Sequence, residues 1–134
     1  MNSNVLYIRE PRKNILGFES PDDWTGIVEA FAISHGTLAL KFWRPATPPK
    51  FVHFIAVEHL SGPITWQGAD LHTGPAEELL LLAKDTQSLS SLGESFLLSK
   101  FQLFEIGMSN AAPRFRMLAS NCIEIDSEFR LSVE

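Results

Sequence analysis

The segment WTGIVEAFAISHGTLALKFWR, residues 24–44, constrains the fold of this chain more than any other feature of its sequence. Two runs rich in β-branched and aromatic residues flank the pair His35-Gly36, which is typical of a tight β-hairpin. Glycine accepts the positive φ that such turns require, and histidine tolerates it better than most residues. A two-residue turn at this point places Phe31 opposite Leu40. This register predicts one apolar face, made of Ile27, Phe31, Ile33, Leu38, Leu40 and Phe42.

Further strands are predicted on both sides of the hairpin. Residues 51–60 are largely apolar on both sides, which favours a central strand. Residues 114–125 alternate apolar and polar side chains, as a strand with one buried face does. Shorter strands are expected at residues 4–10, 100–106 and 129–133.

One helix is predicted near residues 75–85. Thr73 is a candidate N-cap, and Glu77 and Glu78 stand in the first turn, where the helix dipole favours negative charge. The whole chain, residues 1–134, is expected to form a single domain of mainly β (α+β) class. We expect an antiparallel sheet of about six or seven strands that forms a barrel, a roll or a sandwich, with this one helix packed over its end.

Composition and charge restrict the cellular setting and the partners. The single cysteine, Cys122, cannot form a disulfide within the chain and is typical of a reducing compartment. The first residues lack the apolar run of a secretory signal, and the longest apolar run, Leu79–Ala83, is far shorter than a bilayer span. A cytoplasmic protein without membrane contact is therefore expected. The net charge of −5 and the scattered basic residues argue against nucleic-acid binding.

The segment HLSGPITWQGADLHTGP, residues 59–75, holds most of the candidate site residues. Trp66 stands between turn-forming glycines, so it is either an aromatic anchor for a partner or a plug over the open end of the sheet. We favour the plug, because the flanking turns would fold the ring back onto the sheet. On that interpretation, a partner binds elsewhere, on an uncovered sheet face or edge.

Histidines and acidic residues suggest further sites. His59, Asp70 and His72, together with Glu58, are close enough in sequence to form a metal site if the segment folds back on itself. No metal-binding motif supports such a site, and neither a metal nor another cofactor is expected. A separate cavity near His53 is a second candidate for ligand binding.

Two classes of function remain open from the sequence. No catalytic motif is present, which favours a non-enzymatic module that binds another protein or a second copy of itself. In size, acidity and its lone cysteine the chain resembles small bacterial immunity and adaptor proteins, in composition only. The alternative is a small-molecule-binding protein or an enzyme, with its site in the sheet or at the mouth of the sheet. Exposed apolar surface favours the first class, and an internal polar cavity the second.

Overall fold

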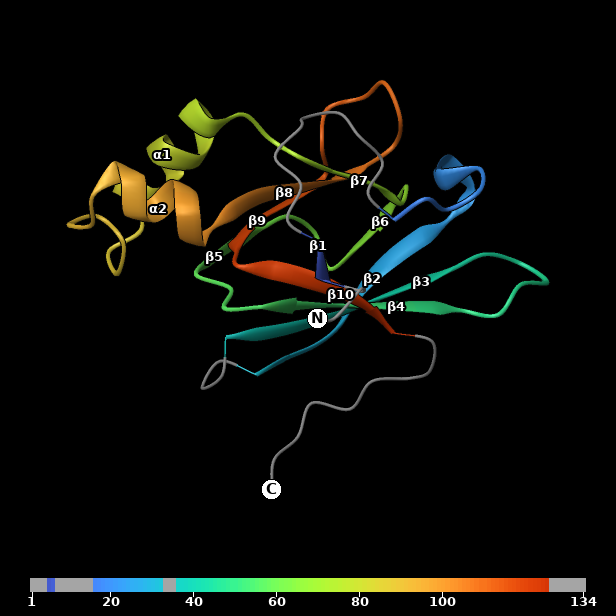
Figure 1. The fold of residues 1–134 in the computed structure, drawn as a ribbon. Helices are drawn as coiled ribbons and strands as arrows, with labels where there is room; N and C mark the ends of the chain where they lie inside the picture. Colours follow the sequence, from blue (N-terminus) through green and yellow to red (C-terminus); the bar gives the residue numbers. More distant parts are fainter. Residues whose placement is uncertain (1–4, 7–15, 33–35, 126–134) are drawn as a thin grey trace.

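The computed structural model describes residues 5–6, 16–32 and 36–125, which form two antiparallel sheets and two α-helices. The larger sheet has the strand order β1–β10–β4–β3–β2–β6, and the smaller has the order β5–β9–β8–β7 (Figure 1). The strands of the larger sheet, in chain order, are β1 (Val5–Leu6), β2 (Thr25–Ala32), β3 (Thr37–Trp43), β4 (Lys50–Ile55), β6 (Thr65–Gln67) and β10 (Asn121–Ile125). Those of the smaller sheet are β5 (His59–Ser61), β7 (Asp70–Thr73), β8 (Gln102–Gly107) and β9 (Phe115–Ala119).

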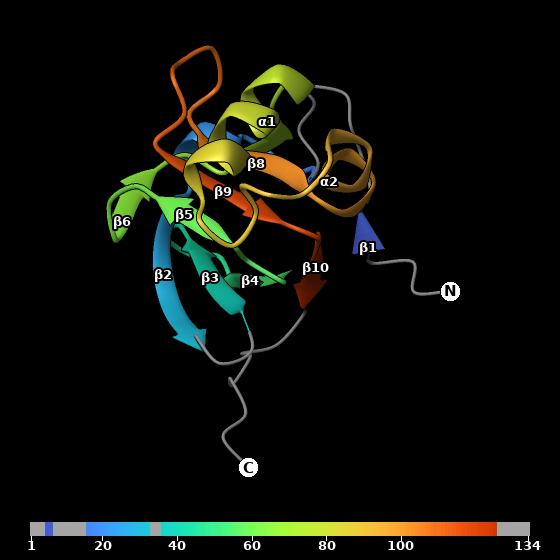
Figure 2. The ribbon, with the colours of Figure 1, turned by 90° about the vertical axis from the view of Figure 1, so that its left-hand side faces the viewer.

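The main hydrophobic core lies between the two sheets. Alternate residues of β3, from Leu38 to Phe42, face alternate residues of β8 and β9, because successive side chains of a strand point to opposite faces. The core includes Leu38, Leu40, Phe42, Val52, Phe54, Leu71, Phe104, Ile106, Phe115, Met117 and Cys122. Figure 2 shows the two sheets stacked, with β2 and β6 at one side and β1 at the other. The arrangement is a sandwich, one of the three expected architectures, and neither sheet closes into a barrel within the described residues.

A second, smaller core joins the helices to the outer face of the smaller sheet. The helices are α1 (Ala76–Asp85) and α2 (Glu94–Lys100), and a 3-10 turn, η1 (Pro21–Asp23), precedes β2. Leu103 and Leu118 point away from the main core and pack against Leu79, Ala83 and Leu97. In the described part of the chain, no helix is long and apolar enough to cross a membrane.

The helix predicted near residues 75–85 is confirmed by α1, although its N-cap is wrong. Pro75 is the N-cap residue, and Thr73 belongs to β7, opposite Phe104. Helix α2 is not predicted by the sequence patterns, because its serines and its short length obscure the apolar stripe. Segment 59–75 is also more regular than expected, since it contains three short strands.

Two segments predicted as single strands each divide between the sheets. Segment 51–60 becomes β4 and β5, separated at Ala56, whose φ is 57°. Segment 114–125 becomes β9 and β10, separated at Ser120. The described residues therefore contain ten strands rather than six or seven. β4 lies between β10 and β3, which agrees with its apolar character on both sides.

The predicted register of the β2–β3 hairpin is wrong. Phe31 lies opposite Leu38 rather than Leu40, and a β-bulge near Glu29 shifts the pairing again, so that Val28 lies opposite Leu40. The connection is longer than two residues, because the last pair before the turn is Ala32 opposite Thr37. Gly36 has the expected positive φ of 59°, whereas Ile33 and His35 lie outside the described residues. As a result Ile27 leaves the predicted core face, whereas Phe31 stays on it opposite Leu38 and is partly exposed.

Candidate functional site

Trp66 is buried, as expected for a plug. Its ring stacks on Phe115, with 4.8 Å between ring centroids, and meets Phe42 edge to face. The indole N–H donates a hydrogen bond to the backbone oxygen of Gly68, at 3.0 Å. Only 4% of the residue is exposed, so it cannot present an aromatic surface to a partner without rearrangement.

The residues proposed for a metal site are not brought together. His59 lies on β5 and both Asp70 and His72 lie on β7, at opposite edges of the four-stranded sheet. Two strands separate these edges, a distance of about 14 Å at the usual strand spacing. The described residues contain no group of three or more His, Cys, Asp or Glu side chains that could hold a metal ion. The suggested cluster of Glu58, His59, Asp70 and His72 is therefore wrong.

His53 lies on the face of the larger sheet that points away from the main core. Its neighbours on β4, Val52 and Phe54, point into the core, so Phe51, His53 and Ile55 share the opposite face. His53 therefore does not face the space between the sheets, so the expected site inside the sheet near His53 is wrong. His53 is half-buried, and this burial lowers its pKa below the usual 6.5.

The remaining candidate, His72, belongs to a row of charged side chains across the smaller sheet. His72, Glu105 and Arg116 are direct cross-strand neighbours on β7, β8 and β9. Nε2 of His72 lies 3.2 Å from Oε1 of Glu105, and Nε of Arg116 donates to Oε2 of the same carboxylate at 3.0 Å. Nη2 of Arg116 also donates to Oε1 of Glu78 on α1, at 2.7 Å.

This charged row ties three strands of the smaller sheet to α1. Both oxygens of the Glu105 carboxylate are used by its neighbours, and the hydrogen bond with His72 and the charge of Arg116 lower its pKa despite burial. A cavity of about 420 Å³ opens above the row and is lined by Pro75, Glu78, Glu105, Pro113 and Arg116. Each charged side chain of its lining is paired with another member of the row. No pattern in the sequence points to Glu105 or Arg116, because their contacts depend on how β8 pairs with β7 and β9.

Cys122 does not offer a reactive thiol either. It alternates with polar residues in the sequence, yet its side chain lies in the main core and is fully buried. Burial, assisted by the charge of Glu124, raises the pKa of the Cys122 thiol to about 12. The thiolate that nucleophilic catalysis requires is therefore disfavoured.

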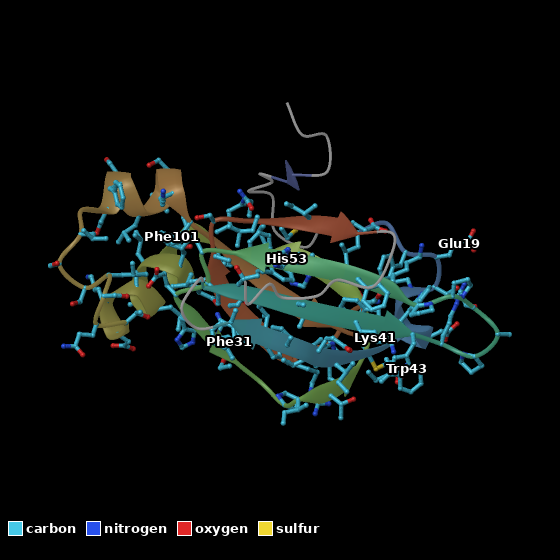
Figure 3. All side chains as sticks on the ribbon, turned by 90° about the horizontal axis from the view of Figure 1, so that it is seen from below. Glu19, Phe31, Lys41, Trp43, His53 and Phe101 are labelled. Carbon is cyan, nitrogen blue, oxygen red and sulfur yellow. The ribbon has the colours of Figure 1, made fainter. Side chains whose placement is uncertain are left out.

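An apolar groove opens at the side of the sandwich, between the end of β2 and the segment that joins β5 to β6. We call it the edge groove; it has a volume of about 240 Å³ and is lined by Val28, Phe31, Leu38, Leu60, Gly62, Pro63, Ile64 and Phe115. Phe31 and Ile64 are large apolar residues of this lining that are exposed, at 40% and 70% of their surface. Figure 3 shows Phe31 towards one end of the β2–β3 hairpin and Trp43 towards the other.

The sequence did not single out this groove. The hairpin pattern predicts Phe31 on the core face but does not predict its exposure at the end of β2, and Ile64 carries no signal in the sequence beside Trp66. The bulge near Glu29 leaves Phe31 on the core face, opposite Leu38, where its ring lines the groove. The chain matches no protein family model, no curated protein and no solved structure.

Proposed function

We propose that this protein is a non-enzymatic module that binds another protein through the edge groove. The observation that carries the proposal is the exposure of Phe31 and Ile64 on the two sides of an apolar depression. Large apolar side chains gathered around one concave patch are typical of interaction sites, whereas isolated ones are ordinary. The lone cysteine is consistent with action in the cytoplasm.

The chemistry of the groove favours a protein partner over a small substrate. Its lining is almost entirely apolar and supplies no charged side chain that would orient a polar molecule. Its volume lies below the range of about 300–1,000 Å³ that is typical of small-molecule sites. A partner that inserts one or two apolar side chains and covers the rim fits these features better.

A capture experiment with a double variant tests this proposal. Wild-type protein and the variant Phe31→Ser with Ile64→Ser are immobilised, and proteins bound from an extract of the native host are quantified by mass spectrometry. The matched control is Leu81→Ser with Phe96→Ser, which removes two exposed apolar side chains from the helices instead. We expect a partner that the control retains and the groove variant loses, with affinity weakened by about tenfold or more in a purified assay.

A thermal melt of each variant shows that the folds are intact before binding is compared. Equal binding of every partner by wild type and groove variant would refute the proposal. Loss of binding only in the helix control would place the interaction surface on α1 and α2.

A further inference from the structure

The outer edge of β2 is only partly covered. β6 pairs with β2 from Thr25 to Ile27, and the N–H of Val28 donates to the carbonyl of Ile64 at 2.8 Å. Beyond this point, from Glu29 to Ala32, no described strand lies beside β2 on that side. Figure 2 shows this edge at the side of the sandwich, where short β6 meets the long β2. A strand edge with open N–H and C=O groups is a template for pairing with another chain.

The register shows which main-chain groups point to this open edge. The N–H of Val28 bonds to Ile64, so the main-chain groups of Val28 point to β6 and away from β3. Main-chain groups of successive residues point to opposite sides of a strand. Leu40, which lies opposite Val28, therefore points away from β2, and its neighbour Ala39 points towards β2. Ala39 lies opposite Ala30 after the bulge, so the N–H and C=O of Ala30 point to β3. Its neighbour Phe31 then turns its N–H and C=O to the open edge. The same residue therefore lines the edge groove with its ring and borders the open edge with its backbone.

We infer that the partner binds as an extended segment that adds an antiparallel strand to β2 beside Glu29–Ala32. This inference rests on the proposed function of the edge groove. The added strand continues the line of β6, exchanges hydrogen bonds with Phe31, and places an apolar side chain between Phe31 and Ile64. Main-chain bonds supply affinity in this mode, and the groove selects the side chain.

Charge indicates a basic segment rather than a second copy of this chain. Glu29 is exposed at the open edge, and the whole chain carries a net charge of −5. Two copies paired through β2 would bring two such acidic edges together, which like-charge repulsion disfavours. A lysine or arginine that flanks the apolar residue of the partner would instead pair with Glu29.

A synthetic peptide tests strand addition directly. The probe is a peptide of about eight residues that alternates valine or leucine with lysine, long enough to span this edge. It is titrated into ¹⁵N-labelled full-length protein, and amide shifts are followed by NMR. We expect the largest shifts at Phe31, Ala32 and Ile64. N-methylation of the peptide amides that face β2 should weaken binding by about tenfold or more, because those hydrogen bonds are lost.

Charge is tested with a matched pair of peptides and one protein variant. Replacing each lysine of the peptide with glutamate should weaken binding to the wild type, and Glu29→Lys should reverse this preference. Glu29 is exposed, so this variant is expected to stay folded. An unchanged preference would overturn the choice of a basic segment.

The outcomes separate this inference from the proposed function. If Phe31→Ser with Ile64→Ser abolishes capture of a native partner but N-methylation has no effect on the peptide, strand addition is wrong and the binding function stands. If capture does not depend on the groove, both fail. A wild-type dimer in analytical ultracentrifugation that Glu29→Lys or Phe31→Ser alters would assign the edge to a second copy and overturn the inference.

Discussion

At the scale of single residues, the absence of a side chain at Gly26 makes room for the ring of Trp66. The two residues lie opposite each other on β2 and β6, and the indole covers the glycine so closely that a Cβ there would lie 2.5 Å from a ring carbon. Glycine at position 26 therefore creates the space that the tryptophan fills. A glycine within a strand often marks such a close approach. The sequence shows a tryptophan among turn residues, but it does not show that the partner of its ring lies about forty positions earlier.

Replacing Trp66 with alanine should destabilise the protein strongly. The ring is buried and contacts Phe42 and Phe115, so its removal leaves a cavity and should cost about 3–5 kcal/mol in free energy of unfolding. Urea denaturation followed by circular dichroism measures this. The control is Trp43→Ala, which removes a partly exposed ring and should cost less than about 1 kcal/mol. Similar midpoints for both variants would contradict the role of Trp66 as a plug.

At the scale of secondary-structure elements, the sequence predicts that a helix or strand exists better than it predicts where that element begins and ends. The helix near residues 75–85 and strands β2, β3 and β4 are confirmed because their apolar patterns are long and regular. The polar pair Ser120-Asn121 interrupts the alternation of residues 114–125, but this interruption alone does not show that the strand changes sheets there. The bulge near Glu29 is equally invisible, since inserting one residue alters the pairing partner without altering composition. The edge groove combines residues of β2, β3 and β9 with the segment that joins β5 to β6, and no local pattern shows that these residues meet.

The charged row links three strands to α1, and its central carboxylate should matter most. Glu105→Gln removes the charged partner of His72 and one of the two carboxylates paired with Arg116, at a nearly buried position, and should cost about 1–3 kcal/mol. Glu78→Gln changes a half-exposed partner of the same arginine and should cost less than about 1 kcal/mol. Chemical denaturation at pH 7 compares the two variants.

The stability of wild type and of Glu105→Gln at acid pH provides a second test of the charged row. The pKa of Glu105 is lowered in the folded state, so its contribution is complete above its usual value of 4.5 and is lost as the pH falls through the folded-state pKa. Below pH 4.5, wild type should therefore lose more stability than Glu105→Gln. Parallel curves for the two proteins would show that the carboxylate is not stabilised by the row.

At the scale of the whole molecule, the class of fold was predictable and its topology was not. Length, apolar content and hairpin pattern lead to an α+β sandwich among the expected architectures. The strand orders were out of reach, because pairing between distant segments is set by tertiary packing rather than by local preference. The same reason explains the failed metal site: closeness in sequence placed His59 beside His72, and the sheet placed them at opposite edges.

The pH dependence of global stability should reflect His53. Burial lowers its folded-state pKa below 6.5, so the unfolded chain binds a proton at a higher pH than the folded protein does. Its neutral form therefore supports full stability above pH 6.5, and this stability is lost as the pH falls towards the folded-state pKa. His53→Gln should lose less stability than wild type between pH 7.5 and 5, as measured by urea denaturation. An equal loss in both proteins would contradict this assignment.

The two places where strands pass between the sheets lie against each other. The N–H of Ser120 donates to the carbonyl of Ile55, and the N–H of Glu58 donates to the carbonyl of Leu118, both at 2.9 Å. Each crossing segment belongs to both sheets, so neither sheet can melt while the other stays intact. Unfolding should therefore proceed as one cooperative step. Forming this junction brings together segments that are far apart along the chain, and it costs chain entropy before other contacts form. We therefore expect formation of the junction to be the slow step of folding.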